Sequence, residues 1–276
     1  MKRIIIPVDF SKYSEYALKT AASLARKHGA ELTVMHMLEL SESIFSSSSN
    51  EKNEETAFML MLADKEFKKF LDKDYLEGLT VTPVIKHHKV LKEVDEVAKS
   101  INADLIVMGS KGHSDHDGVF TGSNTEKVVR HSDIPVLVVK EELDHTDFKN
   151  VVLATDFEED NVAASKNAVN LLQSLGCEVT FLHVNLPNIG FLSTEEIEER
   201  RDAFLELTGH PEWRGHIKYV SDYSVEDGVL KYAVKTNADA IAVISHGRTG
   251  LNLFFGGSIT EDVVNHAKRP VIAFKQ

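Results

Sequence analysis

The 276-residue sequence carries one pattern of apolar runs and loops twice. Three stretches show the duplication: residues 151–157 repeat residues 4–10, residues 179–184 repeat residues 32–37, and residues 237–241 repeat residues 102–106. Such a duplication predicts two copies of one domain rather than a single large domain. The second copy is 12 residues shorter, and the missing residues fall after the second apolar run.

Short β-branched runs alternate with amphipathic helical patterns in each half. In the first half, strands are expected at about residues 4–8, 31–37, 80–86, 105–108 and 134–139. Strands that alternate with helices favour parallel pairing, and right-handed crossovers then place helices on both faces of the sheet. We place the first domain at residues 1–141, a charged linker at 142–149 and the second domain at 150–276.

A glycine-punctuated loop follows the fourth expected strand of the first half. Gly109 and Gly112 are followed by Gly122 and Ser123, where a helical pattern begins. Glycines let backbone N–H groups approach an oxyanion, and the N-terminus of a helix directs its partial positive charge to the same place. The loop therefore predicts phosphate binding, with a plain tight turn as the alternative.

The second half repeats this layout incompletely. The corresponding residues are Gly247, Gly257, Ser258 and Thr260, the last of which matches Thr125. The first glycine of the pattern is missing, because Ile244 stands where the first half has Gly109. A butyl side chain there is expected to intrude on a bound ligand, so we predict weaker binding in the second half.

Taken together, these motifs resemble those of tandem universal stress proteins, which carry two universal stress domains in one chain. Gly109, Gly112, Gly122 and Ser123 match the family pattern G-x2-G-x9-G-[ST], and Asp9 matches the acidic residue found at the adenosine. The resemblance implies an α/β fold of two doubly wound domains, each a five-stranded parallel sheet of order 3-2-1-4-5 flanked by helices. It also implies that the domains pair through their last strands as an internal pseudo-dimer.

The resemblance further implies binding of ATP or a related adenine nucleotide, with or without Mg²⁺. In the first half the implied nucleotide-binding residues are Asp9, Met37, Met108, Gly109, Gly112, Gly122, Ser123 and Thr125. Asp9 would contact the ribose or adenine, and Met37 would face the adenine. Weaker candidates in the second half are Asp156, Val184, Gly247, Gly257, Ser258 and Thr260. Each predicted site lies at the carboxyl ends of strands one and four, between which an open α/β sheet reverses its winding and binds ligands.

The composition argues against several classes of partner. A formal net charge of −12 disfavours nucleic acid, which needs a concentrated basic face. No run approaches the roughly 18 apolar residues of a membrane span, so we expect a cytoplasmic protein with no membrane partner. Cys177 is the single cysteine, which excludes an intrachain disulfide and fits a reducing compartment.

Other polar groups are expected to be solvent-exposed or structural rather than functional. Residues 113–117 include two histidines and two aspartates, but this spacing is typical of a solvated loop, and we predict no metal site. His36 and His183 lie on expected strands and are predicted to be packed and hydrogen-bonded.

We find no catalytic constellation, since neither a G-x-S-x-G elbow nor a P-loop lysine is present. Three functions stay open: a nucleotide-binding stress protein with little or no hydrolysis, an interaction scaffold with a vestigial site, and a slow ATPase. A further homodimer of the whole chain is compatible with each.

Overall fold

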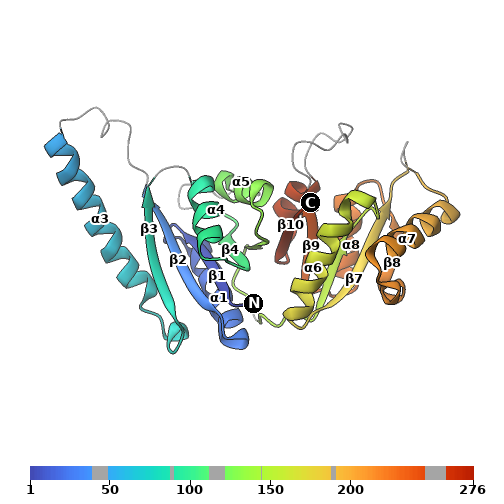
Figure 1. Ribbon diagram of the computed structural model, residues 1–276, viewed down its shortest axis with the longest axis horizontal. Helices are drawn as coiled ribbons and strands as arrows, with labels where there is room; N and C mark the ends of the chain where they lie inside the picture. The colour runs from blue at the N-terminus through green and yellow to red at the C-terminus, as the bar shows by residue number, and fades with distance from the viewer. Residues whose placement is uncertain (39–48, 88–89, 112–121, 144, 188–190, 246–258) are drawn as a thin grey trace. The chain divides into compact units, whose positions relative to one another are not determined.

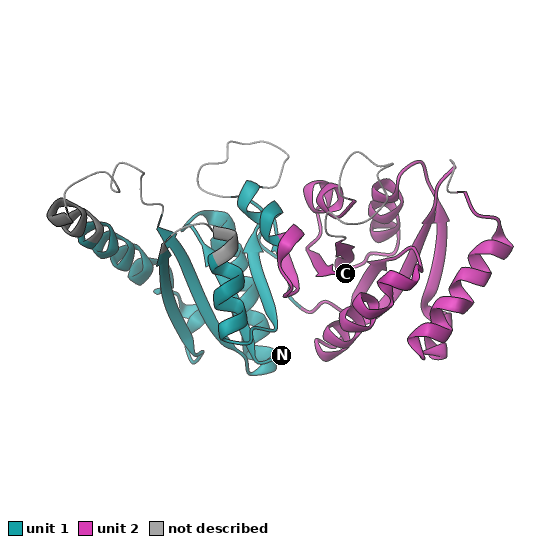
Figure 2. Ribbon diagram, turned by 45° about the horizontal axis from the view of Figure 1, so that its top comes forward, with its two compact units in different colours: residues 1–118, 122–128, 138–146 teal, residues 119–121, 129–137, 147–276 magenta. Residues whose placement is uncertain are grey.

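The structure is a computed structural model that describes residues 1–38, 49–87, 90–111, 122–143, 145–187, 191–245 and 259–276. It forms two compact units (Figure 2). Unit 1 comprises Met1–Gly118, Gly122–Val128 and Val138–Thr146; unit 2 comprises Val119–Thr121, Val129–Leu137 and Asp147–Gln276. The division therefore passes through one helix and one strand of the first repeat, and the boundaries at 141 and 150 stay a prediction from sequence.

The sheet of unit 1 has the order β3-β2-β1-β4-β5. Its strands are β1 (Arg3–Val8), β2 (Glu31–Leu38), β3 (Val81–His87), β4 (Leu105–Gly109) and β5 (Val136–Val139). Strand β1 pairs in parallel with both β2 and β4. The helices of this repeat are α1 (Lys12–His28), α3 (Ser49–Leu71), the 3-10 turn η1 (Asp74–Leu76), α4 (Val90–Ser100) and α5 (Ser123–His131) (Figure 1).

Unit 2 repeats the same topology, with the strand order β10-β9-β6-β7-β8. Its strands are β6 (Asn150–Ala154), β7 (Glu178–Asn185), β8 (Ile217–Ser221), β9 (Ala240–Ser245) and β10 (Val271–Lys275). Its helical segments are η2 (Glu159–Asn161), α6 (Val162–Ser174), α7 (Thr194–Thr208), η3 (Pro211–His216), α8 (Val225–Lys235) and α9 (Ile259–His266). These two sheets confirm the predicted α/β fold class and the predicted strand order.

Strand β5 stands next to β10 in the strand order, as predicted for the last strands of the two sheets. Its first residues, Val136 and Leu137, belong to unit 2. Within that unit Lys275 at the end of β10 forms an ion pair with Asp133 at 2.7 Å. An arginine of α5, Arg130, forms a further ion pair with Glu261 of α9.

The direction of each crossover places the helices on the two faces of each sheet. Strands one to three advance in one direction along the order and strands four and five lie on the other side, so right-handed connections put the first two helices on one face and the last two on the other. In unit 2, α6 accordingly contacts α7, and α8 contacts α9. No helix among the described residues is both long and apolar enough to span a membrane.

Covering both faces explains the apolar runs in the sequence. Ile4, Ile5 and Ile6 of β1 are successive residues that point to opposite faces, and all three are fully buried. Each such side chain contributes about 1.5–3 kcal/mol relative to an exposed one.

The repeated sequence Asn-Ala-Asp has a structural explanation at the amino ends of the strands. Asp104 accepts a hydrogen bond from the backbone N–H of Arg3 at 3.0 Å, and Asp239 accepts one from Asn150 at 2.8 Å. The preceding asparagines, Asn102 and Asn237, have positive φ and end their helices. The repeated Asn-Ala-Asp sequence therefore fixes where the first strand of each repeat begins. It lies at the amino ends of the strands, opposite to the carboxyl ends where the site is predicted.

Candidate functional site

Four of the eight first-half residues predicted to bind nucleotide lie at the carboxyl ends of the neighbouring strands β2, β1 and β4. Strands β1 and β4 pair with each other, and the chain leaves them in opposite directions. Val8 pairs with His36, so Asp9 and Met37 follow as neighbours one residue later. Met108 and Gly109 end β4 on the other side of β1. Four of the eight first-half residues are thus brought to one edge of the sheet, at the position where such folds bind ligands.

Asp9 lies in a tight turn that starts helix α1. Its Oδ1 accepts a hydrogen bond from the backbone N–H of Ser11 at 3.1 Å. The Ser11 hydroxyl in turn caps α1 by accepting from the N–H of Ser14 at 3.3 Å. The backbone between strand and helix is therefore fixed, and the carboxylate is held beside the first turn of α1.

Phe10, between these two residues, has a left-handed backbone with φ +63°, an uncommon conformation for an aromatic residue. Its ring lies 4.4 Å from that of His36 and 5.3 Å from that of Phe67. His36 Nδ1 hydrogen-bonds the carbonyl oxygen of Val8 at 2.8 Å. Packing of the ring offsets a backbone strain of about 1–3 kcal/mol.

The second half repeats this arrangement closely. Phe157 also has φ +63°, and its ring stacks on His183 at 5.4 Å. His183 Nδ1 hydrogen-bonds the carbonyl oxygen of Thr155 at 3.3 Å, and burial lowers the pKa of this histidine. The predicted structural role of both strand histidines is confirmed. The repeated Asp-Phe pair was visible in the sequence, but its positive φ was not.

The two described ends of the glycine loop are joined to each other and to the sheet. The N–H of Gly122 donates to the carbonyl of Ser110 at 2.7 Å, and the N–H of Ser110 donates to that of Val139 at 3.0 Å. The carbonyl of Gly122 accepts from Glu126 at 3.1 Å, so α5 begins immediately after this glycine. The first-turn N–H groups of α5, with exposed Ser123 at their start, are thereby fixed near the end of β4.

Thr125 attaches the start of α5 to β4. Its hydroxyl is buried and donates to the carbonyl of Gly109 at 2.8 Å. In the second half the buried hydroxyl of Thr260 donates to the carbonyl of Ile244 at 3.4 Å. The structure therefore gives both threonines a positioning role, while contact with phosphate stays a prediction.

Gly109 is required by the close approach of α1. A Cβ at this position would lie 2.7 Å from the backbone carbonyl carbon and oxygen of Tyr13 and 2.9 Å from its Cβ. The glycine therefore lets the first turn of α1 pack on the end of β4. The ring of Tyr13 has the amines of Lys12 and Lys111 at 5.0 and 6.0 Å from its centroid. These two cations were missed from sequence, although Lys111 stands inside the glycine motif.

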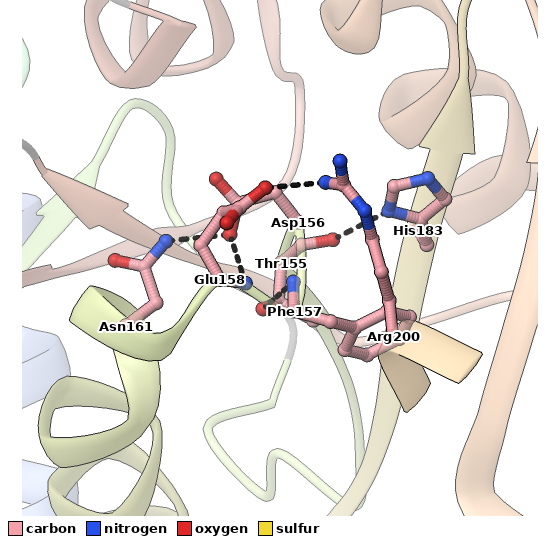
Figure 3. Close-up of polar contacts among 7 residues, drawn as sticks. All are labelled: Thr155, Asp156, Phe157, Glu158, Asn161, His183 and Arg200. Atoms are coloured by element: carbon pink, nitrogen blue, oxygen red, sulfur yellow. Dashed lines mark hydrogen bonds and ion pairs between the residues drawn. The ribbon is translucent and has the colours of Figure 1, made fainter. Parts of the chain in front are cut away.

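The second half has different charges around its aspartate (Figure 3). Asp156 accepts hydrogen bonds from the backbone N–H of Glu158 at 3.1 Å and from the Nδ2 of Asn161 at 2.6 Å. Glu158 forms an ion pair with Arg200 of α7. The position that matches Lys12 is occupied by Glu159, so the cation of the first half is replaced by an acid.

The packing around this second aspartate differs as well. The chain passes through the 3-10 turn η2 before α6 begins at Val162, whereas α1 begins directly after its cap. Ile244 is buried at the position of Gly109. Val184, which matches Met37, is buried too, and its Cγ1 lies 2.6 Å from where a Cβ on Gly228 of α8 would be.

Several predicted residues fall outside the described part of the chain. They are Gly112, Gly247, Gly257, Ser258 and the histidine- and aspartate-containing stretch 113–117. Among the described residues, no group of three or more potential metal ligands comes together.

Comparison with known proteins covers both halves of the chain. The sequence profile described as "Universal stress protein family" matches residues 1–140 and again residues 147–275. A universal stress protein of Mycolicibacterium smegmatis is 27% identical over 290 aligned positions, spanning 99% of this chain and 96% of that protein. The universal stress protein MJ0531 of Methanocaldococcus jannaschii is 28% identical over 149 positions, which cover 50% of this chain and 82% of its own length.

Solved structures show the same fold over the whole chain. A universal stress protein from Archaeoglobus fulgidus superposes with a TM-score of 0.69 at 22% identity, covering 99% of this chain and 96% of the other. A putative universal stress protein from Pseudomonas aeruginosa gives a TM-score of 0.64 at 15% identity, with coverage of 100% and 93%.

Proposed function

The chain belongs to the Universal stress protein family, and on that premise we propose that its first repeat binds an adenine nucleotide such as ATP. The observation that carries the proposal is the fixed start of α5. Gly122 is hydrogen-bonded to Ser110 at the end of β4, and the helix opens at the next residue. This arrangement directs backbone N–H groups and the partial positive charge of the helix to the edge of the sheet that also carries Asp9.

The charges around this edge suit a polyphosphate. Lys12 and Lys111 both lie against the ring of Tyr13, and the backbone and Cβ of Tyr13 pack on the end of β4. We assign the phosphates to the N-terminus of α5 and these two amines, and the ribose hydroxyls to the carboxylate of Asp9. Met37 and Met108 then offer apolar surface to the adenine. Mg²⁺ would arrive with the nucleotide, held by its phosphates.

We propose binding with little or no hydrolysis, in a cytoplasmic stress response. A general base must reach an attacking water within hydrogen-bond distance. The carboxylate of Asp9, at this edge of the sheet, accepts a hydrogen bond from Ser11 within its turn and is assigned here to the ribose. A scaffold with a vestigial site is the alternative, and it is distinguished by the absence of nucleotide binding in the wild-type chain.

The test is calorimetric titration of the full chain with ATP. Gly122→Val is expected to abolish binding, because a β-branched side chain would occupy the space in which phosphate approaches the N–H groups. Gly215→Val is the matched control. Gly215 lies in η3 of unit 2, and a Cβ at this position meets open space. Equal affinity of both variants and wild type would move the site elsewhere, and no binding to any of them would favour the scaffold.

A further inference from the structure

One residue of the first repeat joins the end of β5 to the start of α5. Ser110 directly follows β4, and its N–H donates to the carbonyl oxygen of Val139 at 3.0 Å. The carbonyl oxygen of Ser110 accepts from the N–H of Gly122 at 2.7 Å. Strand β5 ends at Val139, so Lys140 is the first residue beyond it. Lys140 and the first N–H groups of α5 therefore both lie next to Ser110.

A second lysine begins from the adjacent strand end. Lys111 follows Ser110 as Lys140 follows Val139, and hydrogen-bonded neighbouring strands are about 4.8 Å apart. Both lysines are half-buried. Two ammonium groups that are close together and partly withdrawn from water repel each other, and an anion bound to both lowers that energy.

The second repeat uses its corresponding lysine differently. Lys275 ends β10 as Lys140 follows β5. Its amine forms an ion pair with the carboxylate of Asp133 at 2.7 Å. The position of Lys111 is taken by His246 in the second repeat. A lysine at the end of the last strand is thus common to both repeats, whereas the pair of lysines occurs in the first.

We propose that Lys140 is a third cation for the phosphates of the nucleotide, beside Lys12 and Lys111, and that it makes the site prefer a triphosphate to a monophosphate. The inference rests on the proposed function, because that function places the phosphates at the start of α5. The flexible four-carbon stem of a lysine is long enough to bring its amine from the end of β5 to that helix start. Coulomb attraction grows with the charge of the ligand, so an additional cation gains more from a triphosphate.

The amine of Lys140 also couples the site to pH. Burial, followed by the positive charge of Lys111, lowers the pKa of Lys140 to about 8. The other charged groups on the described segments around it are Glu126 in the first turn of α5, Glu141 on its own segment, and Glu142, which forms an ion pair with Lys19 of α1. Near pH 8 the free chain therefore holds Lys140 about half protonated. A bound polyanion raises the pKa again, so binding takes up a proton.

Calorimetric titration of the full chain with ATP and with AMP at about pH 8, in two buffers of different ionisation enthalpy, tests the proposal. The difference between the buffers gives the number of protons taken up. The nucleotide contributes little to it, because a terminal phosphate loses its last proton near a pH of about 6. Wild type is expected to bind ATP with uptake of about half a proton.

Two substitutions separate charge from structure. Lys140→Met should weaken ATP binding about tenfold, weaken AMP binding less, and abolish the proton uptake. Lys140→Arg keeps a charge that does not titrate, so it should hold the ATP affinity within about threefold of wild type and still abolish the uptake. A purely structural role of the lysine would not produce that combination. Lys218→Met, at an exposed position on β8 of unit 2, is the control and should match wild type in both measurements.

The outcomes distinguish this inference from the proposed function. If ATP binds, and its affinity and proton uptake are the same in Lys140→Met as in wild type, the role of Lys140 is wrong and the nucleotide site stands. If ATP does not bind, titration with inorganic triphosphate decides. Binding with a proton uptake that depends on Lys140 overturns the nucleotide alone, and no binding of either ligand overturns both proposals.

Discussion

In each repeat the pair Asp-Phe follows the first strand, and the phenylalanine packs on a strand histidine in both, yet the residues that come after the pair carry different charges. Phe10 and Phe157 share φ +63° and a histidine ring neighbour. The pair Asp9-Phe10 is followed by Ser-Lys-Tyr, whereas the pair Asp156-Phe157 is followed by Glu-Glu-Asp. The duplication has therefore kept the residues that build the sheet edge, while the residues that would meet an anion have diverged.

This difference supports one nucleotide site per chain. A triphosphate bound as proposed at the first repeat would approach Lys12 and Lys111, while at the second it would approach three successive acids, residues 158–160. The replacement of Gly109 by Ile244 is only one part of the contrast. The backbone differs as well. The second half passes through the turn η2, whereas the first half brings the backbone of Tyr13 so close to the end of β4 that no Cβ fits at position 109.

Among substitutions that exchange features between the two repeats, the largest effect is expected when the first site is given the charges of the second. The double variant Lys12→Glu/Lys111→Glu should weaken ATP binding on the order of 100-fold, because two charge-assisted contacts are lost at about 1.5 kcal/mol each. Titration calorimetry at low salt measures it. Lys218→Glu/Lys235→Glu in unit 2 is the control. An affinity within a factor of two of wild type would show that these amines do not face the phosphates.

A second effect separates the two threonines. Thr125→Val removes a buried 2.8 Å bond to Gly109 and should lower the stability of unit 1 by about 1–3 kcal/mol, whereas Thr260→Val removes a 3.4 Å bond to Ile244 and should cost less. Trp213 is the single tryptophan and is buried in unit 2, so its fluorescence follows that unit, while circular dichroism follows both. Equal losses from the two substitutions would contradict the comparison.

A smaller effect concerns pH. Burial lowers the pKa of His183 in the folded chain. Below a pH of about 6.5, the ordinary histidine pKa, the unfolded chain therefore binds more protons than the folded chain. The contribution of His183 to the free energy of unfolding is complete above that pH and is lost as the pH falls. Denaturation followed by Trp213 fluorescence should show unit 2 losing stability in this window, and His183→Gln should reduce the slope. The same slope in both proteins would assign it to other groups.

The smallest effect is expected from Ile244→Gly alone. Removing the side chain opens the end of β9, but the acids at 158–160 stay in place. We expect any gain in the affinity of the second repeat for ATP to be below about tenfold, or roughly 1.4 kcal/mol. Titration of this substitution in the Gly122→Val background isolates the second repeat. A gain that brings it level with the first repeat would make Ile244, rather than the charges, the main cause of the asymmetry.

The fold was accessible from the sequence because its signals are local or repeated. The buried run Ile4–Ile6 indicates a strand covered on both faces, and the alternation with helical patterns determines parallel pairing. The gathering of Asp9 and Gly109 could also be predicted, since the carboxyl ends of parallel strands meet at one edge. The strand order followed from the resemblance and is confirmed.

What sequence reasoning missed depends on contacts between distant residues. Gly109 meets Tyr13 across 96 positions of the chain, and Thr125 reaches back to Gly109. No local pattern reports either contact, and the bond from Asn161 to Asp156 required knowledge of where α6 begins. For the same reason the cations Lys12 and Lys111 emerged as part of one site only once α1 and β4 were seen together.

The most direct test of the central claim is the stoichiometry of ATP binding to the full chain, measured by calorimetry with the nucleotide located by crystallography. We predict one nucleotide per chain, at the start of α5 beside Asp9, and loss of that nucleotide in Gly122→Val. Two nucleotides of equal affinity, or a single one beside Asp156, would contradict the account.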